Sequence, residues 1–490
     1  MKQKVSIVGS GIAGLASAIQ LACAGYKVTV FEKNAYPGGK LSELKLGDYR
    51  FDKGPSLLTM PHLIEELQTL SGFDEPFSYR RLDILTHYFF EDGTALVASK
   101  SARDFAKEIS TKLLEDEMAV TAHLKRSELY YKLTAGIFLE QSISRIKNFL
   151  NIKTVKALAN IAKLNLSLTM NQQNSKTFRN KKTVQIFNRY ATYNGSDPYK
   201  APALLNIIPH LEFGMGAYLP EGGMHKITEY LFKMAEHSGV NFRFNESVEE
   251  IVLNGKNVEG IIANGKAYSS KIVISDVDIK VVYSKLLPIQ YSPKKLLNQE
   301  KSSSAFVFYW GINKEFSQLD IHNILFSENY EEEFRCLFQE DRPFSDPTIY
   351  INITSKANKN DAPGASENWF VMVNVPHNKS GSTILYKEEL RKNIIAKINR
   401  ILKTDIEKYI VVEDTLDPQS IEVNTSSFGG SLYGNASNNK YSAFFRHPNF
   451  SRQIKGLYFV GGSVHPGGGI PLCLLSAKIA SGMILKEHHA

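Results

Sequence analysis

The amino-acid sequence predicts an α/β fold in which one parallel sheet is assembled from discontinuous segments of the chain. Near the start, residues 4–31 have the pattern of a strand, a helix and a second strand, with glycines where the first strand meets the helix. Near the other end, residues 457–485 have the pattern of a strand, a glycine-rich run and a helix. These segments stand over 400 residues apart, so the sheet must draw on both ends of the chain.

The first strand-to-helix turn carries Gly9, Gly11 and Gly14. Gly9 permits the tight turn, Gly11 lets the backbone approach a pyrophosphate at the helix N-terminus, and Gly14 lets the helix pack closely on the strand. Glu32 ends the second strand, eighteen residues after Gly14, and can accept hydrogen bonds from ribose hydroxyls. This context indicates a dinucleotide-binding unit rather than a fortuitous glycine turn, although NAD and FAD use the same one.

The residues that follow favour FAD. Gly38 and Gly39 allow the chain to double back along the cofactor, and Lys40 can reach a phosphate or a ribose. The run Gly54-Pro55-Ser56 is of a kind that lines the isoalloxazine end of FAD. Together these segments predict that the N-terminal part of the chain follows the cofactor along much of its length.

The middle of the chain returns to the sheet. Gly222 and Gly223 lead into a helix expected over residues 226–237. Strands joined by Asn-Gly turns at 254–255 and 264–265 are expected next. A buried strand that ends near Asp276 then rejoins the cofactor-binding part.

The closing segment is expected to approach the flavin. Gly461 and Gly462 let the preceding strand pass against the ribityl chain, and the glycines at 467–469 remove side chains where a planar ring must lie. Ile470 and Pro471 start the last predicted helix, because proline lacks an N–H that would have no partner there. The positive end of this helix would stabilise negative charge on the reduced flavin.

The opening motif, the segment FDKGPS and the closing HPGGGIP resemble a flavoprotein family that includes amine oxidases, protoporphyrinogen oxidase and carotenoid desaturases. They are most similar to bacterial-type phytoene desaturases, and the resemblance runs essentially end to end. Residues 187–227 look most like the subgroup of 3,4-desaturases that act on hydroxylated carotenoids.

The resemblance implies a Rossmann-like FAD-binding domain of the amine oxidase/phytoene desaturase type, joined to a substrate domain of mixed sheet plus helices. The FAD-binding domain is expected from residues 1–75, 220–290 and 430–490, and the substrate domain from residues 76–219 and 291–429. Val248 would present its backbone to the adenine, and Lys40 stands where the family commonly has an arginine, which removes the bidentate fork. The cofactor-binding residues implied are Gly9, Ser10, Gly11, Ile12, Ala13, Gly14, Glu32, Lys33, Gly38, Gly39, Lys40, Leu41, Gly54, Pro55, Ser56, Val248, Asp276, Gly461, Gly462, Gly469, Ile470 and Pro471.

The function implied is FAD-dependent desaturation of a carotenoid, with a new C-3,4 double bond in a hydroxylated acyclic or monocyclic substrate. A hydride would pass to flavin N5, with oxygen or a quinone as the final electron acceptor. A long apolar tunnel is the main requirement, because a polyene spreads the positive charge that develops. Glu212, His225 and His465 are weak catalytic candidates, since each also suits a structural role.

Other readings remain open at this stage. Within carotenoid chemistry the alternatives are a phytoene desaturase or a redox-neutral isomerase; among other flavoenzymes, an amine oxidase. A non-catalytic prenyl-lipid-binding protein of the Rab escort type is an alternative from a different class. No zinc-type metal motif and no Gly-x-Ser-x-Gly elbow is present, so metal and serine chemistry are not expected.

The charge is unevenly distributed. Between residues 141 and 190 there are ten Lys or Arg and no Asp or Glu. The chain has a net charge of +8, so the residues outside this window carry a net charge of about −2. Apolar residues are interleaved at helical spacing, which suits an interfacial helix on anionic lipid. We therefore expect residues 130–185 to contact a membrane surface. The alternative is a solvated helical face, and no nucleic-acid module accompanies the charge.

The three cysteines are scattered, without redox or zinc-ligand spacing, which indicates a reducing compartment. No run of 18 apolar residues is present. Lys2 and Lys4 before an apolar run mimic a signal peptide, but the glycines at motif spacing and the strand-like segment that follows argue against one. The expected location is therefore cytoplasmic, with peripheral membrane association.

Overall fold

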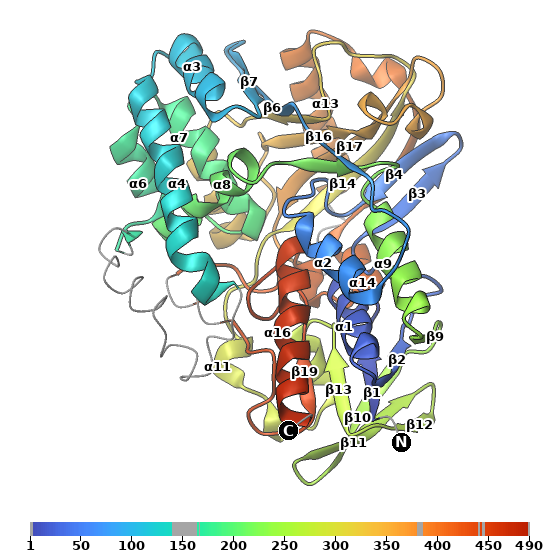
Figure 1. The fold of residues 1–490 in the computed structure, drawn as a ribbon. Helices are drawn as coiled ribbons and strands as arrows, with labels where there is room; N and C mark the ends of the chain where they lie inside the picture. Colours follow the sequence, from blue (N-terminus) through green and yellow to red (C-terminus); the bar gives the residue numbers. More distant parts are fainter. Residues whose placement is uncertain are drawn as a thin grey trace.

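A five-stranded parallel sheet occupies the half of the molecule that contains both termini (Figure 1). The computed structural model describes residues 3–139, 164–165, 167–379, 386–439, 442 and 446–488. The strand order is β19-β13-β1-β2-β9, so the N-terminal strands β1 and β2 lie between β13 and β9 from the middle of the chain, and the C-terminal strand β19 forms one edge. The bounds are β1 Lys4–Val8, β2 Lys27–Phe31, β9 Asn241–Arg243, β13 Ile272–Ser275 and β19 Leu457–Phe459. The predicted α/β sheet from discontinuous segments is confirmed.

Both faces of this sheet are covered, which explains why β1, β2 and β13 are rich in Val and Ile. On one face α1 (Ile12–Cys23) packs beside α16 (Ile470–His488), although the two helices come from opposite ends of the chain (Figure 1). The helix α9 (Lys226–His237) packs against α1 from the other side, with the bounds that the sequence predicted.

The opposite face carries a three-stranded antiparallel sheet. It consists of β10 (Val248–Asn254), β11 (Asn257–Ala263) and β12 (Lys266–Ser269), which pair in sequence order. The backbone has positive φ at Gly255 (60°) and Gly265 (72°), so the predicted Asn-Gly turns are confirmed. Apolar side chains of this sheet and of the parallel sheet form one shared core.

A seven-stranded mixed sheet forms the other half of the molecule, in the order β18-β14-β17-β16-β15-β6-β7. All neighbours are antiparallel except β15 and β6. The long strand β14 is buried along its whole length, and α13 packs against one face of the sheet. The bounds are β6 Ile84–Phe89, β7 Ala95–Ser99, β14 Ser304–Ile312, β15 His322–Leu325, β16 Ile349–Ile353, β17 Glu367–Val375, β18 Ile410–Leu416 and α13 Lys387–Leu402.

A group of helices lies beside this sheet (Figure 1). It comprises α3 Ala102–Leu113, α4 Glu117–Phe138, α6 Met170–Thr177, α7 Lys181–Asn188 and α8 Ile208–Phe213. Of the region expected to contact a membrane, residues 130–185, the part formed by residues 140–163 and 166 lies outside the described residues. Within the described residues, no helix combines the length and the apolar character that crossing a membrane requires.

Shorter elements connect the two halves. They are β3 Ser42–Leu46, β4 Tyr49–Lys53, β5 Tyr79–Arg81, β8 Tyr218–Pro220, α2 His62–Ser71, α10 Ile279–Val281, α11 Lys294–Leu297, α12 Tyr330–Arg335 and α14 Pro418–Thr425. The strands of the parallel sheet all come from residues 1–75, 220–290 and 430–490, while the domain boundaries themselves stay a prediction.

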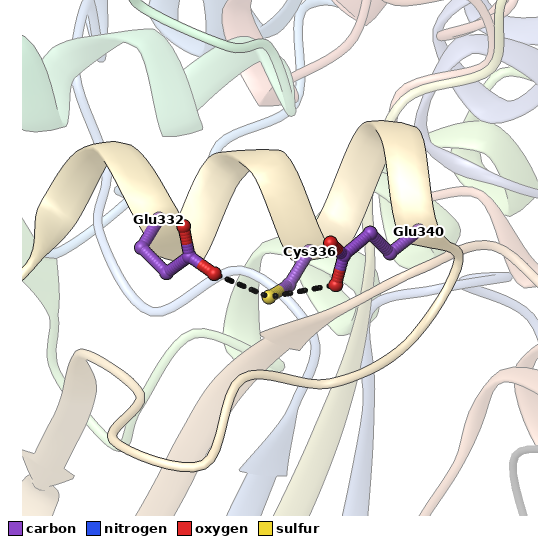
Figure 2. Close-up of side chains that lie close together, drawn as sticks. All are labelled: Glu332, Cys336 and Glu340. Carbon is purple, nitrogen blue, oxygen red and sulfur yellow. Dashed lines mark hydrogen bonds between the residues drawn. The ribbon is translucent and has the colours of Figure 1, made fainter.

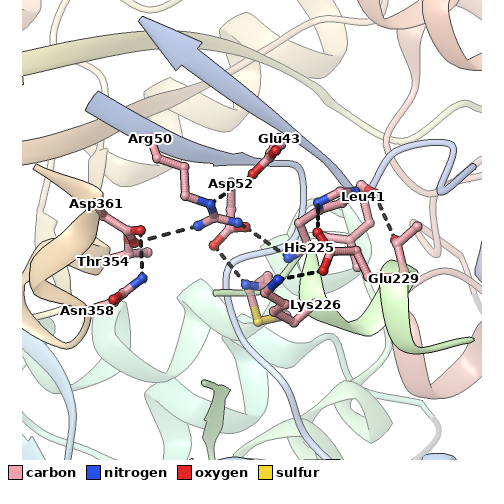
Figure 3. Close-up of polar contacts among 12 residues, drawn as sticks. Leu41, Glu43, Arg50, Asp52, His225, Lys226, Glu229, Thr354, Asn358 and Asp361 are labelled. Atoms are coloured by element: carbon pink, nitrogen blue, oxygen red, sulfur yellow. Dashed lines mark hydrogen bonds and ion pairs between the residues drawn. The ribbon is translucent and has the colours of Figure 1, made fainter. Parts of the chain in front are cut away.

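A buried ion-pair network ties the hairpin β3–β4 to both halves (Figure 3). The carboxylate of Asp52 accepts hydrogen bonds from the backbone N–H groups of Met224 (2.8 Å) and His225 (2.9 Å) at the start of α9. It also pairs with Arg50 at 2.6 Å, and Arg50 reaches Asp361, beside the large sheet, at 3.6 Å. Asp52 therefore caps a helix and anchors a cation at the same time.

Removal of the Asp52 carboxylate should destabilise the fold. In Asp52→Ala, Arg50 loses its shortest ion pair and two helix N–H groups lose their acceptor, which should lower the free energy of unfolding by about 3 kcal/mol. Urea denaturation followed by circular dichroism measures this loss. The matched control is Asp83→Ala, because Asp83 forms an exposed pair with Lys100 and should change stability little. Equal stability of the two variants would contradict the role given to the network.

Candidate functional site

Two cavities meet between the halves of the molecule. The first, here called the polar cavity, has a volume of about 750 Å³ and is lined by residues around Gly11, Glu32 and Asp276. The second, here called the apolar cavity, has a volume of about 470 Å³ and extends between the large sheet and the helices. They share lining residues from two glycine-containing segments, at 39–40 and 468–470. A long ligand with one polar and one planar end could therefore reach from one cavity into the other.

The N-terminus of α1 opens into the polar cavity. A side chain at Gly11 would place its Cβ 2.5 Å from a carboxylate oxygen of Asp276, and one at Gly14 would place its Cβ 2.3 Å from the carbonyl oxygen of Gly9. Gly9 itself has a φ of 94°, which favours glycine. These glycines keep the first N–H groups of the helix accessible to an anion, as a pyrophosphate site requires.

Glu32 holds the glycine turn in place. Its carboxylate accepts hydrogen bonds from the backbone N–H of Ser10 (2.9 Å), the hydroxyl of Ser10 (2.8 Å) and the backbone N–H of Asn34 (3.0 Å). The side chain also lines the polar cavity, so its remaining lone pairs can accept from a ribose hydroxyl.

Asp276 lies at the centre of the polar cavity. Its carboxylate accepts a hydrogen bond from the Gly14 N–H at 2.9 Å, next to the expected pyrophosphate site. Burial raises the pKa of Asp276 to about 7, and the Glu32 carboxylate adds to this rise, whereas the Gly14 N–H and Lys40 oppose it. The side chain is therefore poised to be neutral beside a bound anion.

The C-terminal glycine segment closes the shared wall of the cavities. A Cβ at Gly461 would lie 2.4 Å from Asp276, and one at Gly468 would lie 2.7 Å from the ring of Tyr433. The buried guanidinium of Arg446 donates to the carbonyl oxygens of Tyr433 and Asn435, each at 2.8 Å. These hydrogen bonds hold the backbone of residues 433–435 beside the wall. The last helix, α16, begins directly beyond this wall at Ile470.

The comparisons with known proteins agree with this geometry. Residues 12–485 match the model of the family described as flavin containing amine oxidoreductase. The chain belongs to this family. The site is therefore that of a flavin-dependent oxidoreductase, and the dinucleotide geometry of the polar cavity assigns the flavin as FAD.

Two curated relatives are similar over nearly their whole length. A 1-hydroxycarotenoid 3,4-desaturase of Flavobacterium sp. is 48% identical over 485 residues, which cover 98% of this chain and 99% of the relative. A 4,4'-diapolycopene oxygenase of Methylomonas sp. is 30% identical, covering 99% and 98%. Among solved structures, cyclohexylamine oxidase from Brevibacterium oxydans shares the fold with a TM-score of 0.64 at 13% identity, over 100% of both chains.

The residues present fit FAD. The glycines leave space for its pyrophosphate at α1, Glu32 faces the ribose position, and the wall at 468–470 can border the ring. Of the predicted cofactor residues, those that line the polar cavity are Gly9, Gly11, Ile12, Ala13, Glu32, Lys33, Gly38, Gly39, Lys40, Leu41, Pro55, Val248, Asp276, Gly462, Gly469 and Ile470. Gly54, Ser56 and Pro471 line the apolar cavity instead, whereas Ser10, Gly14 and Gly461 support the walls from behind.

Two lysines have a role that the sequence did not indicate. The ammonium of Lys40 donates to the carbonyl oxygens of Ser431 (3.1 Å) and Leu432 (2.6 Å). Lys33 donates to the hydroxyl of Ser426 at 2.9 Å. Both therefore fasten a segment more than 380 residues away over the cofactor site, and burial lowers the pKa of Lys40 and of Lys33.

The catalytic candidates are placed differently from one another. His465 lines the apolar cavity next to the shared wall. Glu212 is buried behind that cavity, where it accepts hydrogen bonds from Tyr190 (2.7 Å) and Tyr193. His225 lies at the start of α9 beside Glu229 and lines neither cavity (Figure 3).

A buried arginine in the apolar cavity was not predicted as a site residue. Arg189 donates to the Tyr88 hydroxyl at 2.8 Å, and its ring contact with Tyr190 is 4.3 Å from guanidinium carbon to centroid. Glu212 pairs with it at 3.4 Å from the far side. The only sequence signal was its place in the tyrosine-rich stretch at 187–193.

One cluster has the residue types of a metal site but different bonding. Figure 2 shows Cys336 between Glu332 and Glu340, with all three ligand-type groups close together. The thiol lies within hydrogen-bond reach of Glu332 (3.8 Å) and Glu340 (3.5 Å) and can donate to either, and burial raises the pKa of Cys336 to about 11. Arg335 pairs with both carboxylates, so the arrangement is an ion-pair cluster on the surface.

Affinity for FAD should depend on the protonation of Asp276. FAD brings a negative pyrophosphate, so it binds best to the neutral acid, which predominates below pH 7. Between about pH 6 and pH 8 the dissociation constant should rise about tenfold. Titration of the apoprotein, followed by flavin fluorescence, measures this change.

Asp276→Asn should bind FAD with the same affinity at both pH values. Asp278→Asn is the matched control, because Asp278 lines the same cavity and should leave the pH dependence in place. A pH dependence that survives in Asp276→Asn would overturn the assignment.

Proposed function

We propose that this protein is an FAD-dependent carotenoid desaturase that introduces a C=C bond, at C-3,4, into a hydroxylated acyclic or monocyclic carotenoid. The observation that carries the proposal is the apolar cavity, which ends at the same glycine wall as the FAD site. The name of the 48% identical relative supports the hydroxylated substrate and the position of the new bond.

The residues of the apolar cavity perform three tasks in this reaction. Met60, Leu211 and Ile324 are among the apolar side chains that exclude water and hold a polyene. The glycines at 468–469 let the substrate come close to the shared wall without a side chain between. FAD, when bound, supplies the hydride acceptor, while oxygen or a quinone is proposed as the final electron acceptor.

A strong base is not required by this arrangement. A cation on a conjugated chain is stabilised by the polyene itself, so proton loss needs only a weak acceptor or water. Of Glu212, His225 and His465, His465 is the one that lines the apolar cavity, and it is the candidate proton acceptor. Glu212 positions Arg189 and Tyr190 instead. His225 has a structural role at the start of α9, where its backbone N–H donates to Asp52.

We propose that the protein takes its substrate from a membrane surface. Tyr131, Thr134 and Leu139 of the α4 segment line the apolar cavity, and the basic, apolar window begins immediately after them in the chain. A carotenoid is dissolved in lipid, so a cavity that reaches this segment could open where anionic lipid holds the protein.

The reaction can be tested with the FAD-loaded protein and polyenes in liposomes. Desaturation predicts a product two hydrogen atoms lighter, with a red-shifted absorbance, from a carotenoid hydroxylated at carbon 1. A product of unchanged mass but altered geometry would indicate an isomerase. A protein that takes up no flavin after addition of FAD would favour the lipid-binding alternative.

Membrane contact should depend on salt. We expect the protein to co-sediment with anionic liposomes at low ionic strength and to be released at high ionic strength, because basic side chains give most of the attraction. Exchange of Lys153, Lys156 and Lys163 for Gln should weaken this binding. The matched control exchanges Lys256, Lys294 and Lys295, which are exposed and lie outside the window. Equal loss in both triple variants would sink the proposed docking segment.

A further inference from the structure

One polar residue that lines the apolar cavity has a ring nitrogen without a partner in the described part of the chain. His322, on β15 of the large sheet, lines the cavity and is only 4% exposed. Its Nδ1 atom is engaged by the Tyr350 hydroxyl at 2.7 Å, and the Tyr350 hydroxyl lies 2.6 Å from that of Ser56. Among the described residues its Nε2 atom has no hydrogen-bond partner and is closed to solvent, so a ligand reaches it after a small movement of the cavity wall. An unmet buried polar atom is costly, so a ligand that supplies its partner gains affinity.

The hydrogen bonds fix the tautomer of this histidine. The amide nitrogen of Asn352 donates to the carbonyl oxygen of Ile321 at 2.9 Å, which sets the orientation of that amide. The same nitrogen lies 3.2 Å from Nδ1 of His322, so Nδ1 is the acceptor and Nε2 carries the proton. Burial lowers the pKa of His322 to about 3, and the charge of Arg189 adds to this effect, so the ring is neutral.

We propose that the Nε2–H group of His322 recognises the hydroxyl group of the substrate and so selects hydroxylated polyenes. The inference rests on the proposed function and names the group that reads its substrate. An Nε2–H donor requires an acceptor oxygen, which a hydroxyl provides and a hydrocarbon polyene lacks. A hydrocarbon polyene would leave the Nε2–H group without an acceptor, which lowers its affinity relative to the hydroxylated polyene.

Hydrogen bonds connect His322 to a segment that lines the cavity together with the glycine wall. Ser56 follows the Gly54-Pro55 segment, and this segment lines the cavity together with the glycine wall at 468–469. Ser56, Tyr350 and His322 form a hydrogen-bonded chain that leads from that segment into the cavity. In a 1-hydroxy substrate the oxygen is three bonds from carbon 3, so a donor near this wall would bind the hydroxyl when carbons 3 and 4 reach the reacting position.

The test compares two polyenes that differ only in a hydroxyl at carbon 1. For each protein, the dissociation constant is measured from quenching of tryptophan fluorescence, and kcat/KM is measured with FAD bound. The wild type should prefer the hydroxylated polyene in both measurements. In His322→Leu this preference should fall by 10-fold to 100-fold, through weaker binding of the hydroxylated polyene alone.

Two further variants separate recognition from folding. His322→Gln retains an N–H donor at a similar position and should recover most of the preference. His123→Leu is the matched control, because His123 is also a buried, neutral histidine but packs between aromatic rings away from both cavities. It should keep the full preference.

The outcomes distinguish this inference from the proposed function. A preference for the hydroxylated polyene that is unchanged in a folded His322→Leu protein would overturn the role of His322, whatever the activity. If the protein binds hydroxylated polyenes selectively through His322 but yields no desaturated product, the proposed reaction fails and the recognition site stands.

Discussion

The whole architecture depends on the close approach of three distant chain segments around Asp276. Gly11 and Gly14 of α1, Gly461 after β19 and Asp276 after β13 lie so close that a Cβ at any of the three glycines would collide with a neighbouring oxygen. This approach packs α1 onto the sheet and lets the Gly14 N–H donate to Asp276. The same contacts define the polar cavity, so the stability of the sheet and the affinity for FAD share one set of atoms.

Much of the parallel sheet could be predicted from the sequence because its signals are local. Glycines at fixed spacing, Val and Ile runs and Asn-Gly turns identified β1, α1, β2 and the β10–β12 sheet, and the bounds of α9 were predicted to the residue. The order of the large sheet could not be predicted. Its parallel contact between β6 and β15 joins residues more than 200 positions apart, and no local pattern encodes such a pairing.

The same division applies to the site. Backbone approach to a phosphate leaves a trace in the sequence, because it requires glycine at defined positions. The distant partners of a side chain leave no such trace in the sequence. The local sequence suggested that Lys40 reaches a phosphate, yet its ammonium donates to the carbonyl oxygens of Ser431 and Leu432. His322 stands in an ordinary short strand, and its unpartnered nitrogen becomes visible only when Tyr350 and Asn352 are placed around it.

The two cavities have different roles in the proposed function, cofactor binding in the polar cavity and substrate selection in the apolar cavity. Cyclohexylamine oxidase shares this fold at 13% identity, so the fold alone does not determine the substrate. In the function we propose, the substrate is selected in the apolar cavity, whose walls come from the large sheet and the helices. Polar side chains in these walls also have protein partners, as Arg189 has in Tyr88 and Glu212. A hydrocarbon chain satisfies such walls along most of its length, and an unpaired donor is the feature that makes one end of that chain different from the other.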